Sequence, residues 1–243
     1  PITKSKFQQQ ISRSLLTQPL YMADGHHRYE TALNYQQERL QASCDSNEAS
    51  SAAFNYVMMT LVEFSDPGLV VFPIHRLVRG IVPSTLLRLR KQLEDFFILE
   101  SIPLTESLIS SLECRLPGNA MLGVLGLEAQ VLITLSPRPA IEDMMPETHS
   151  QAYKTFDTSL AYHLILDRML GLASDSGNLD YTVDVNEACH MINKSGYQLA
   201  FLLNPPNLAT IKAIVDAKDK MPRKSTYFYP KLPAGLIINP LSE

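Results

Sequence analysis

Three features that define large protein classes are missing or sparse in this sequence. No apolar stretch reaches the ~20 residues that a helix needs to cross a bilayer, and no signal-peptide pattern opens the chain. The cysteines, Cys44, Cys114 and Cys189, are odd in number, lie far apart and form no CxxC pair. Buried or unreactive thiols in a reducing compartment are the simplest interpretation. We therefore expect a cytoplasmic protein with no membrane partner.

An excess of basic residues is also missing. Lysine and arginine together number 21 and aspartate and glutamate 25, so the formal charge is −4. Broad nucleic-acid binding needs a basic face, so this balance argues against it. The sequence contains neither a GxSxG turn nor a cysteine beside a histidine motif, and nucleophilic catalysis therefore finds little support.

The chain does contain enough apolar material for a core. Hydrophobic residues make up 45% of the 243 residues and charged residues 19%, a balance typical of globular proteins. This length allows one large domain or two small ones. We expect a first segment at 1–80, an α/β insertion or small subdomain at 81–146 and a C-terminal α/β segment at 147–243, or one domain containing all three. The proline-rich stretch 137–146 is typical of a surface excursion or a linker.

Hydrophobic periodicity predicts an irregular alternation of helices and strands. Helical spacing of apolar residues favours helices at 5–17, 26–42, 84–97, 157–170, 186–194 and 207–219. Runs rich in β-branched and aromatic residues favour strands at 20–23, 54–64, 69–78, 121–127, 130–136, 179–185, 197–204, 225–230 and 235–239. Asn207 is a good N-cap for the last helix. The uneven alternation predicts an α+β fold, with a mixed sheet and flanking helices.

The most unusual stretch, ADGHHRYETAL, follows the predicted strand at 20–23. We call residues 24–30 the first box, and its chemically active members are Asp24, Gly25, His26, His27, Arg28 and Glu30. Gly25 lets a ligand approach the backbone, and the first amides of the next helix have no internal acceptor. Arg28 adds a planar cationic fork suited to phosphate oxygens. Together these groups predict a phosphate cradle at a helix N-terminus.

The ionisable residues of the first box have alternative roles. His26 and His27 can donate hydrogen bonds or carry a proton near neutral pH. His26 and Glu30 share a helix face, but two ligands do not make a metal site, and an ion pair is commoner. Asp24 can cap the helix, act as a base or bind Mg²⁺. A capped helix start with solvated charges is the structural alternative for the whole box.

A second polar group lies in DPGLVVFPIHRLV (66–78), which we call the second box. It places Asp66, His75 and Arg76 in or beside an apolar strand. Charged side chains in such a strand need partners. The sequence favours neither of two roles for His75 and Arg76: a structural ion pair with an acidic neighbour, or a part in a functional site.

The third box is MPRKSTYFYPK (221–231). Its site candidates are Lys224, Ser225, Thr226 and Tyr227. The Lys-Ser-Thr sequence is similar to the end of a P-loop, but the glycines that precede it there are absent, so a P-loop is rejected. A lysine with two hydroxyls at the start of a strand can still contact a phosphate or a sugar. A strand with solvated basic residues is the structural alternative.

In combination, the three boxes resemble those of a bacterial and archaeal family called domain of unknown function 1015. The matching stretches are ADGHHRYETAL, DPGL…HRLV and MPRKSTYFYPKL…GL, which span residue 20 to about 236. Members of that family are longer, so the resemblance implies that the chain corresponds to their C-terminal portion. The start at Pro1 rather than at a methionine agrees with a fragment of a longer protein.

GHHRYETA is also similar to the GERRYRA box of the ParB and sulfiredoxin superfamily, which includes ParB CTPases and free-serine kinases. This likeness implies a ParB/sulfiredoxin-like segment near the N-terminus, in which Gly25, His26, His27 and Arg28 contact nucleotide phosphates. The sequence departs from the pattern by having His26 where ParB has glutamate. It also lacks the upstream strand on which the kinases carry a catalytic carboxylate.

We therefore expect the chain to bind a nucleotide or other phosphorylated small molecule. Transfer of a phosphoryl group to a small metabolite and hydrolysis of a nucleotide are the two reactions that such a site allows. The predicted phosphate contacts are Gly25, Arg28, Lys224, Ser225 and Thr226, provided that the third box folds back onto the first. The predicted catalytic groups are Asp24, His26, His27 and Glu30, with Mg²⁺ accompanying the nucleotide. A nucleotide-gated binding module without turnover is the alternative, and DNA contact is a distant third.

Overall fold

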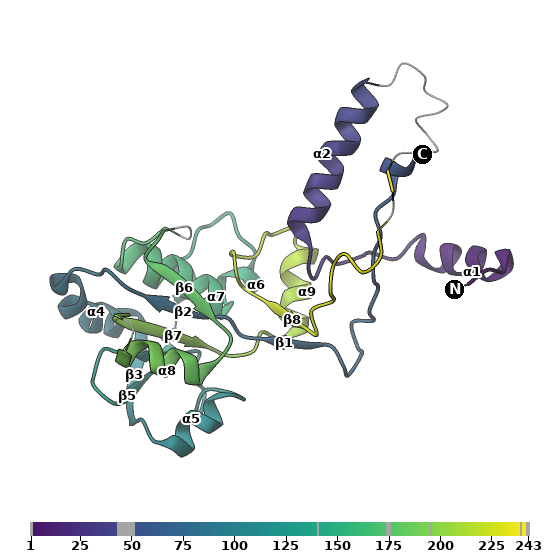
Figure 1. Cartoon of the computed structure of the whole chain (residues 1–243). Coiled ribbons are helices and arrows are strands. Elements are labelled where there is room, and N and C mark those ends of the chain that lie inside the picture. The colour runs from purple at the N-terminus through teal and green to yellow at the C-terminus, as the bar shows by residue number, and fades with distance from the viewer. Residues whose placement is uncertain are drawn as a thin grey trace. The chain divides into compact units, whose positions relative to one another are not determined.

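The computed structural model describes residues 2–42, 52–139, 141–173, 176–194, 196–238 and 240–241. The chain divides into two compact units (Figure 1). Unit 1 comprises Pro1–Val62 and Leu232–Glu243, and unit 2 comprises Glu63–Lys231. Cys44 lies outside the described residues. The division of the chain at residues 80 and 146 stays a prediction.

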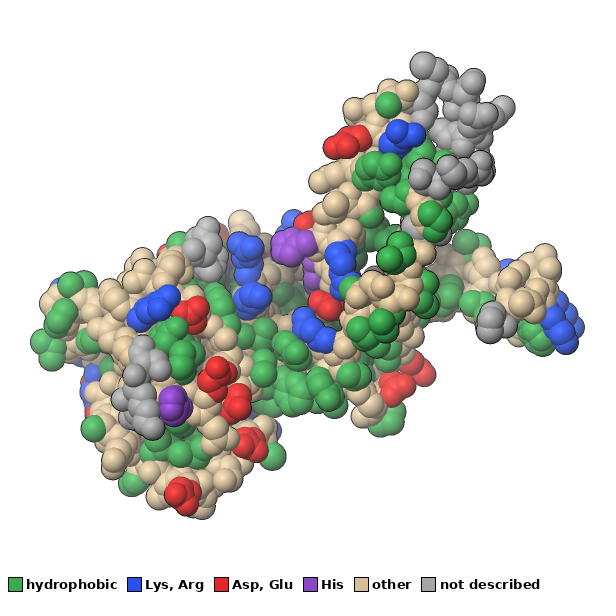
Figure 2. All heavy atoms as spheres, in the orientation of Figure 1, with side chains coloured by type: hydrophobic (Ala, Val, Ile, Leu, Met, Phe, Trp, Pro, Cys, Tyr) green, Lys and Arg blue, Asp and Glu red, His purple; other side chains and the backbone are tan. Residues whose placement is uncertain are grey.

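The described part of unit 1 holds α1 (Ser5–Leu15), α2 (His26–Ala42) and the 3₁₀ turn η1 (Ala53–Asn55). Both predicted helices are confirmed, and α2 begins and ends at the predicted residues. The Gln36 side chain donates a hydrogen bond to Asn55 Oδ1 at 2.9 Å, which ties α2 to η1. Neither helix has a buried residue, and Figure 2 shows hydrophobic side chains at the surface of this unit.

The strands predicted at 20–23, 54–64 and 235–239 are wrong for the residues that the structure describes. Residues 20–23, 56–63 and 235–238 form no strand, and 53–55 form the 3₁₀ turn. Tyr56 and Met58 are 66% and 63% exposed, so the apolar run is not in a core. A strand needs a neighbour that completes its backbone hydrogen bonds, and a β-branched composition cannot supply one.

Unit 2 is built on a six-stranded sheet with helices on both faces (Figure 1). Its strands are β2 (His75–Val78), β3 (Phe97–Pro103), β4 (Leu122–Leu125), β5 (Val131–Pro137), β6 (Leu179–Thr182) and β7 (Leu199–Leu203). The spatial order is β3-β5-β4-β7-β2-β6, and each neighbouring pair is antiparallel. The α+β class with flanking helices is therefore confirmed, but the predicted mixed sheet is wrong, because every described ladder of this sheet is antiparallel.

In β2, β4, β5 and β7, neighbouring side chains enter two different hydrophobic clusters, because successive residues of a strand point to opposite faces of the sheet. On β2, Val78 packs in one cluster with Leu89 and Leu164, while Leu77 packs in the other with Leu112. The first face is covered by α4 (Pro83–Phe96), α6 (Gln151–Lys154), α7 (Asp157–Leu160), the π-helix η3 (Ala161–Met169) and α9 (Leu208–Asp216). The second face is covered by α5 (Glu106–Leu112) and α8 (Val185–Lys194).

Most of the elements predicted for unit 2 are confirmed. The hairpin appears as β4 and β5, and the Asn207 side chain caps α9 by accepting a hydrogen bond from Ala209 N at 2.8 Å. The surface excursion predicted at 137–146 is wrong, because it contains the short helix η2 (Ile141–Met144) and buries Ile141 and Met145 in the core. The strand β3 and the helix α5 were not predicted.

A separate ribbon pairs β1 (Val70–Phe72) with β8 (Tyr227–Tyr229). The strands are antiparallel, with Val70 opposite Tyr229 and Phe72 opposite Tyr227. The ribbon brings the second and third boxes side by side. Among the described residues, no helix is long and apolar enough to cross a membrane.

Candidate functional site

The first box forms a compact turn at the start of α2. Gly25 has a φ of +82°, a conformation that glycine adopts without steric cost. A Cβ on Gly25 would lie 3.2 Å from Arg28 Nη2 and 3.4 Å from its Nε. The missing side chain therefore leaves the space that the Arg28 guanidinium fills. The arginine fork and the first amides of α2 lie within the same short segment.

Gly25, rather than Asp24, holds the N-cap position of α2. Its carbonyl accepts the first helical hydrogen bond, from Tyr29 N at 3.0 Å. The Asp24 carboxylate instead lies 3.7 Å from Arg28 Nη2. The prediction that Asp24 is the cap residue is therefore wrong, because Asp24 lies two positions before the first helical residue, His26, and the cap position is the one directly before it.

The charged side chains of the first box are exposed and paired with one another. His27 Nδ1 lies 3.6 Å from Glu30 Oε2, and these side chains are 90% and 69% exposed. Arg28 and Asp24 are 62% and 46% exposed. Exposed ion pairs contribute only about 0–1 kcal/mol, so an incoming anion can displace the Asp24 carboxylate from Arg28.

The second and third boxes meet through Arg76. This side chain is 3% exposed, and its Nη2 donates a hydrogen bond to the Lys224 carbonyl at 2.8 Å. Its Nη1 donates to the Ile74 carbonyl, and its Cζ lies 5.9 Å from the centre of the Tyr181 ring. Within the described part of the chain, no carboxylate forms an ion pair with Arg76. Burial lowers the pKa of Arg76 to about 10, so the buried group remains a cation at neutral pH.

His75, the neighbour of Arg76 on β2, is buried and neutral. It is 1% exposed, and its Nδ1 accepts a hydrogen bond from Leu203 N at 3.2 Å. The proton of the neutral ring must therefore sit on Nε2, which has no partner among the described residues. Burial first and the Arg76 charge second lower its pKa to about 4, against a smaller opposing effect of Asp184.

The remaining candidates of the third box have different environments. Ser225 is buried and its hydroxyl donates to the Pro222 carbonyl, so that hydroxyl already has a partner. Thr226 and Tyr227 are half-buried, and Lys224 is exposed with a φ of +58°. The Lys231 ammonium lies 4.8 Å from the centre of the Tyr227 ring. Of the predicted site residues in this box, the Lys224 ammonium and the half-buried hydroxyls of Thr226 and Tyr227 are available to a ligand.

Asp66 shapes the turn at the start of the second box. Its Oδ1 accepts a hydrogen bond from Gly68 N at 2.8 Å, and its carbonyl accepts one from Leu69 N at 3.0 Å. Neither contact connects it with His75 or Arg76. Across the described residues, no three side chains of the kinds that bind metals gather closely enough to hold an ion.

A cluster around His149 carries no sequence motif. His149 Nδ1 lies 2.8 Å from Asp219 Oδ1, and Asp219 Oδ2 accepts a hydrogen bond from Ser150 N at 2.6 Å. The Tyr153 ring stacks on His149 at 3.9 Å, and its hydroxyl lies 3.0 Å from His163 Nε2. Burial raises the pKa of the Asp219 carboxyl, but the hydrogen bonds from Ser150 and His149 outweigh it and lower the pKa. His149 and Asp219 are 70 residues apart, so sequence spacing does not reveal their contact.

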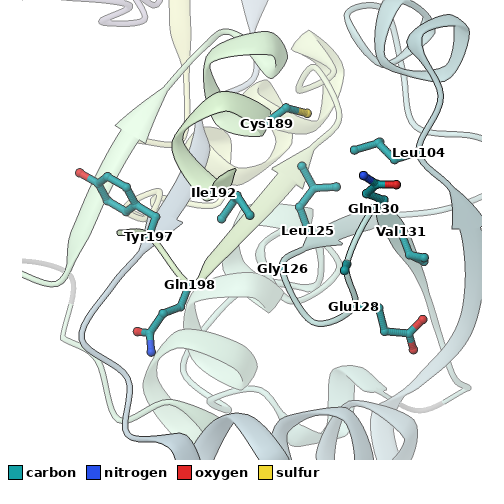
Figure 3. A pocket seen from close by; sticks show the side chains of 11 residues that line it. Leu104, Leu125, Gly126, Glu128, Gln130, Val131, Cys189, Ile192, Tyr197 and Gln198 are labelled. Atoms are coloured by element: carbon teal, nitrogen blue, oxygen red, sulfur yellow. The ribbon is translucent and has the colours of Figure 1, made fainter. Parts of the chain in front are cut away.

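A cavity of about 260 Å³ lies between the β4–β5 loop, α8 and the residues that follow α8 (Figure 3). Leu104, Leu125, Val131 and Ile192 give it apolar walls, and the Cys189 thiol also faces it. Burial raises the pKa of that thiol, which keeps it protonated and unreactive. No residue of the three boxes lines this cavity.

Comparison with known proteins identifies one family. Residues 1–182 match the model of a family described as Protein of unknown function (DUF1015). No curated protein matches the chain.

Solved structures resemble the chain at low identity. A conserved hypothetical protein from Pyrococcus furiosus is 16% identical, with a TM-score of 0.42 over 72% of this chain and 62% of that one. A mutant free serine kinase in complex with AMP is 16% identical, with a TM-score of 0.41 over 70% and 57%. The same kinase with ADP gives a TM-score of 0.40. The chain thus spans 62% and 57% of the length of these proteins, and the family assignment rests on the family model alone.

Proposed function

The chain belongs to the DUF1015 family, and we propose that it binds a nucleotide or another phosphorylated small molecule at the first box. The observation that carries the proposal is the fit of the Arg28 guanidinium against Gly25, where a Cβ would lie only 3.2 Å from Nη2. This fit holds a bidentate cation beside the unpaired amides that begin α2. We further propose that this box is the ParB/sulfiredoxin-like feature of a cytoplasmic protein.

The groups of the first box divide the work of binding a phosphate. Arg28 supplies the charge and the planar fork, and the dipole of the 17-residue helix α2 favours an anion at the same end. His26 and His27 are exposed and can donate hydrogen bonds to further oxygens. Since Asp24 holds Arg28 only through a surface ion pair, phosphate binding replaces a weak contact with a stronger one.

The proposed reaction is transfer of a phosphoryl group from the nucleotide to a small metabolite. A dedicated metal cage is not needed for this, because Mg²⁺ is bound by one or two carboxylates together with the phosphates of the substrate. Asp24 and Glu30 are the carboxylates of the box that fit this role. His27, paired with Glu30, is placed to hold or release a proton at Nδ1.

The experiment that tests the proposal is a thermal-shift and calorimetric titration of ATP and ADP, with Mg²⁺ or with EDTA. The variants are Arg28→Ala and the matched control Arg13→Ala, which removes an exposed arginine from the last turn of α1. We expect both nucleotides to stabilise the wild type and Arg13→Ala, and Arg28→Ala to lose at least about tenfold in affinity. Unchanged affinity in Arg28→Ala would refute the site.

A second measurement separates the enzyme from the binding module. After incubation with ATP, Mg²⁺ and a pool of small hydroxyl-bearing metabolites, ³¹P spectra report any new phosphate ester. A new ester that disappears in Arg28→Ala supports phosphoryl transfer. Binding without a new ester supports the nucleotide-gated module instead.

A further inference from the structure

A strongly basic loop follows α9 in unit 2. We call Lys218–Lys224 the basic loop, and its cations are Lys218, Lys220, Arg223 and Lys224, all of them exposed. In a protein with a formal charge of −4, this is an unusual concentration of one sign. Within the described part of the chain, none of the four forms an ion pair with a carboxylate.

The single acid of the basic loop is already engaged. Asp219 faces inward, where His149 Nδ1 lies 2.8 Å from one oxygen and Ser150 N donates to the other at 2.6 Å. The Asp219 side chain is only 12% exposed. The Asp219 carboxylate is therefore bound within unit 2 by His149 and Ser150, and it forms no described ion pair with the four exposed cations.

The loop is held at both ends, which gives it a defined shape. Asp219 fixes one end to the residues that begin α6, and the Lys224 carbonyl fixes the other to Arg76 at 2.8 Å. Lys218 and Lys224 both have left-handed backbone angles, with φ of +61° and +58°. A loop that is ordered before binding loses less conformational entropy when a ligand arrives.

Arg76 adds a buried positive charge at the end of the loop. The guanidinium is 3% exposed, and two backbone carbonyls and the Tyr181 ring are its contacts. A buried charge without a counter-ion is costly, and its field is screened less than that of a surface charge. The fold thus keeps a positive potential where the third box begins, and an anion bound there would compensate it.

We propose that the basic loop, together with the Thr226 and Tyr227 hydroxyls that follow it, is a binding site for a phosphoryl oxyanion such as a phosphate ester or a diphosphate. Lys224 and Arg223 contact the ligand. Arg76 is a positioning residue: it binds the Lys224 carbonyl, and its buried guanidinium adds positive potential at the site. This site lies within unit 2 and uses no residue of the first box. The two proposals therefore depend on different residues and can be refuted independently of each other.

The test is calorimetric titration of inorganic pyrophosphate into the full chain carrying Arg28→Ala, in which the first box is disabled. ADP and adenosine are titrated in parallel, since adenosine carries no phosphate. We expect pyrophosphate to bind and its affinity to fall steeply with salt. ADP binding without pyrophosphate binding would overturn the inference, as would binding of adenosine alone, and so would the absence of binding by all three.

Loop variants locate the site. Lys224→Met should weaken pyrophosphate binding at least about fivefold, because a charge-assisted contact is lost. Lys91→Met removes an exposed lysine from α4 and should leave the affinity unchanged. Equal affinity in these two variants would overturn the assignment to the loop. Lys220→Met with Arg223→Met provides an independent check that leaves the Arg76 anchor intact.

Arg76 itself is tested by comparing Arg76→Met with Arg76→Lys. If Arg76 acts through charge and position, Arg76→Met should weaken pyrophosphate binding about tenfold, and Arg76→Lys should recover part of that loss. Melting temperatures of both variants without ligand supply the structural control. Unchanged affinity in an Arg76→Met variant that melts like the wild type would refute the role of the buried charge.

Discussion

Acidification should destabilise the chain through His75, and the size of the effect follows from its burial. The folded side chain is 1% exposed and its pKa is lowered from 6.5 to about 4. As the pH falls, the unfolded chain takes up this proton before the folded chain does. Stability that is present at neutral pH is therefore lost between about pH 6.5 and about pH 4.

At 1.36 kcal/mol per pKa unit, the loss between about pH 7.5 and about pH 4.5 is roughly 2.5 kcal/mol. The matched variant is His75→Asn, whose Oδ1 can take the place of Nδ1 and accept the Leu203 N–H. This variant cannot titrate, although its smaller side chain lowers the stability at every pH. Asp157 and the other acid-sensitive groups are the same in both proteins, so their effects cancel in the comparison.

The assay is urea unfolding followed by circular dichroism, at about pH 7.5 and about pH 4.5, for wild type and His75→Asn. We expect the wild type to lose roughly 2.5 kcal/mol more than the variant over this interval. Proton NMR of the His75 ring should show no titration above about pH 5. Equal losses in the two proteins, or a ring that titrates near its ordinary value, would refute the reasoning.

Three further substitutions test positions where backbone or burial decides the outcome. Gly25→Ala should lower the unfolding free energy by about 1 kcal/mol or more and should weaken nucleotide binding. The control Gly235→Ala has a similar φ of +87°, and its added Cβ would meet no described atom within 4 Å beyond the adjacent residues, so it should affect stability only. Gly126→Ala would place a Cβ 2.1 Å from the Gln198 carbonyl oxygen, so urea unfolding should show a loss above about 3 kcal/mol, and a loss below about 1 kcal/mol would contradict the geometry. Burial raises the pKa of Asp157 to about 6, so this carboxylate is destabilising above that pH. The unfolding free energy of Asp157→Asn minus that of the wild type should therefore be roughly 2.5 kcal/mol larger at about pH 7.5 than at about pH 4.

Helical periodicity in the sequence predicted much of the fold, because local rules determine helix ends. The limits of α2 at His26 and Ala42 and the Asn207 cap follow from side chains within a few positions of each terminus. Strands were less predictable. The run 54–64 has a strand composition, but the pairing of a strand depends on a distant segment that composition does not identify.

The candidate sites show the same division between local and distant information. The first box could be recognised because Gly25 and Arg28 meet across three positions of one turn. His75 and Arg76 could be recognised as unusual within an apolar strand, but the acceptor that joins Arg76 to the third box is a carbonyl 148 residues away. A backbone carbonyl carries no residue identity, so no pattern of side chains could have indicated that contact.

The β1–β8 ribbon makes unit 2 an inserted domain. Because Val70 lies opposite Tyr229, the chain enters and leaves unit 2 on two neighbouring strands, about 5 Å apart. Unit 1 is assembled from the segments on either side, Pro1–Val62 and Leu232–Glu243. Because β1 and β8 hold the two ends of unit 2 together, this domain can change in size or sequence during evolution while the distance between its two connections to unit 1 stays the same.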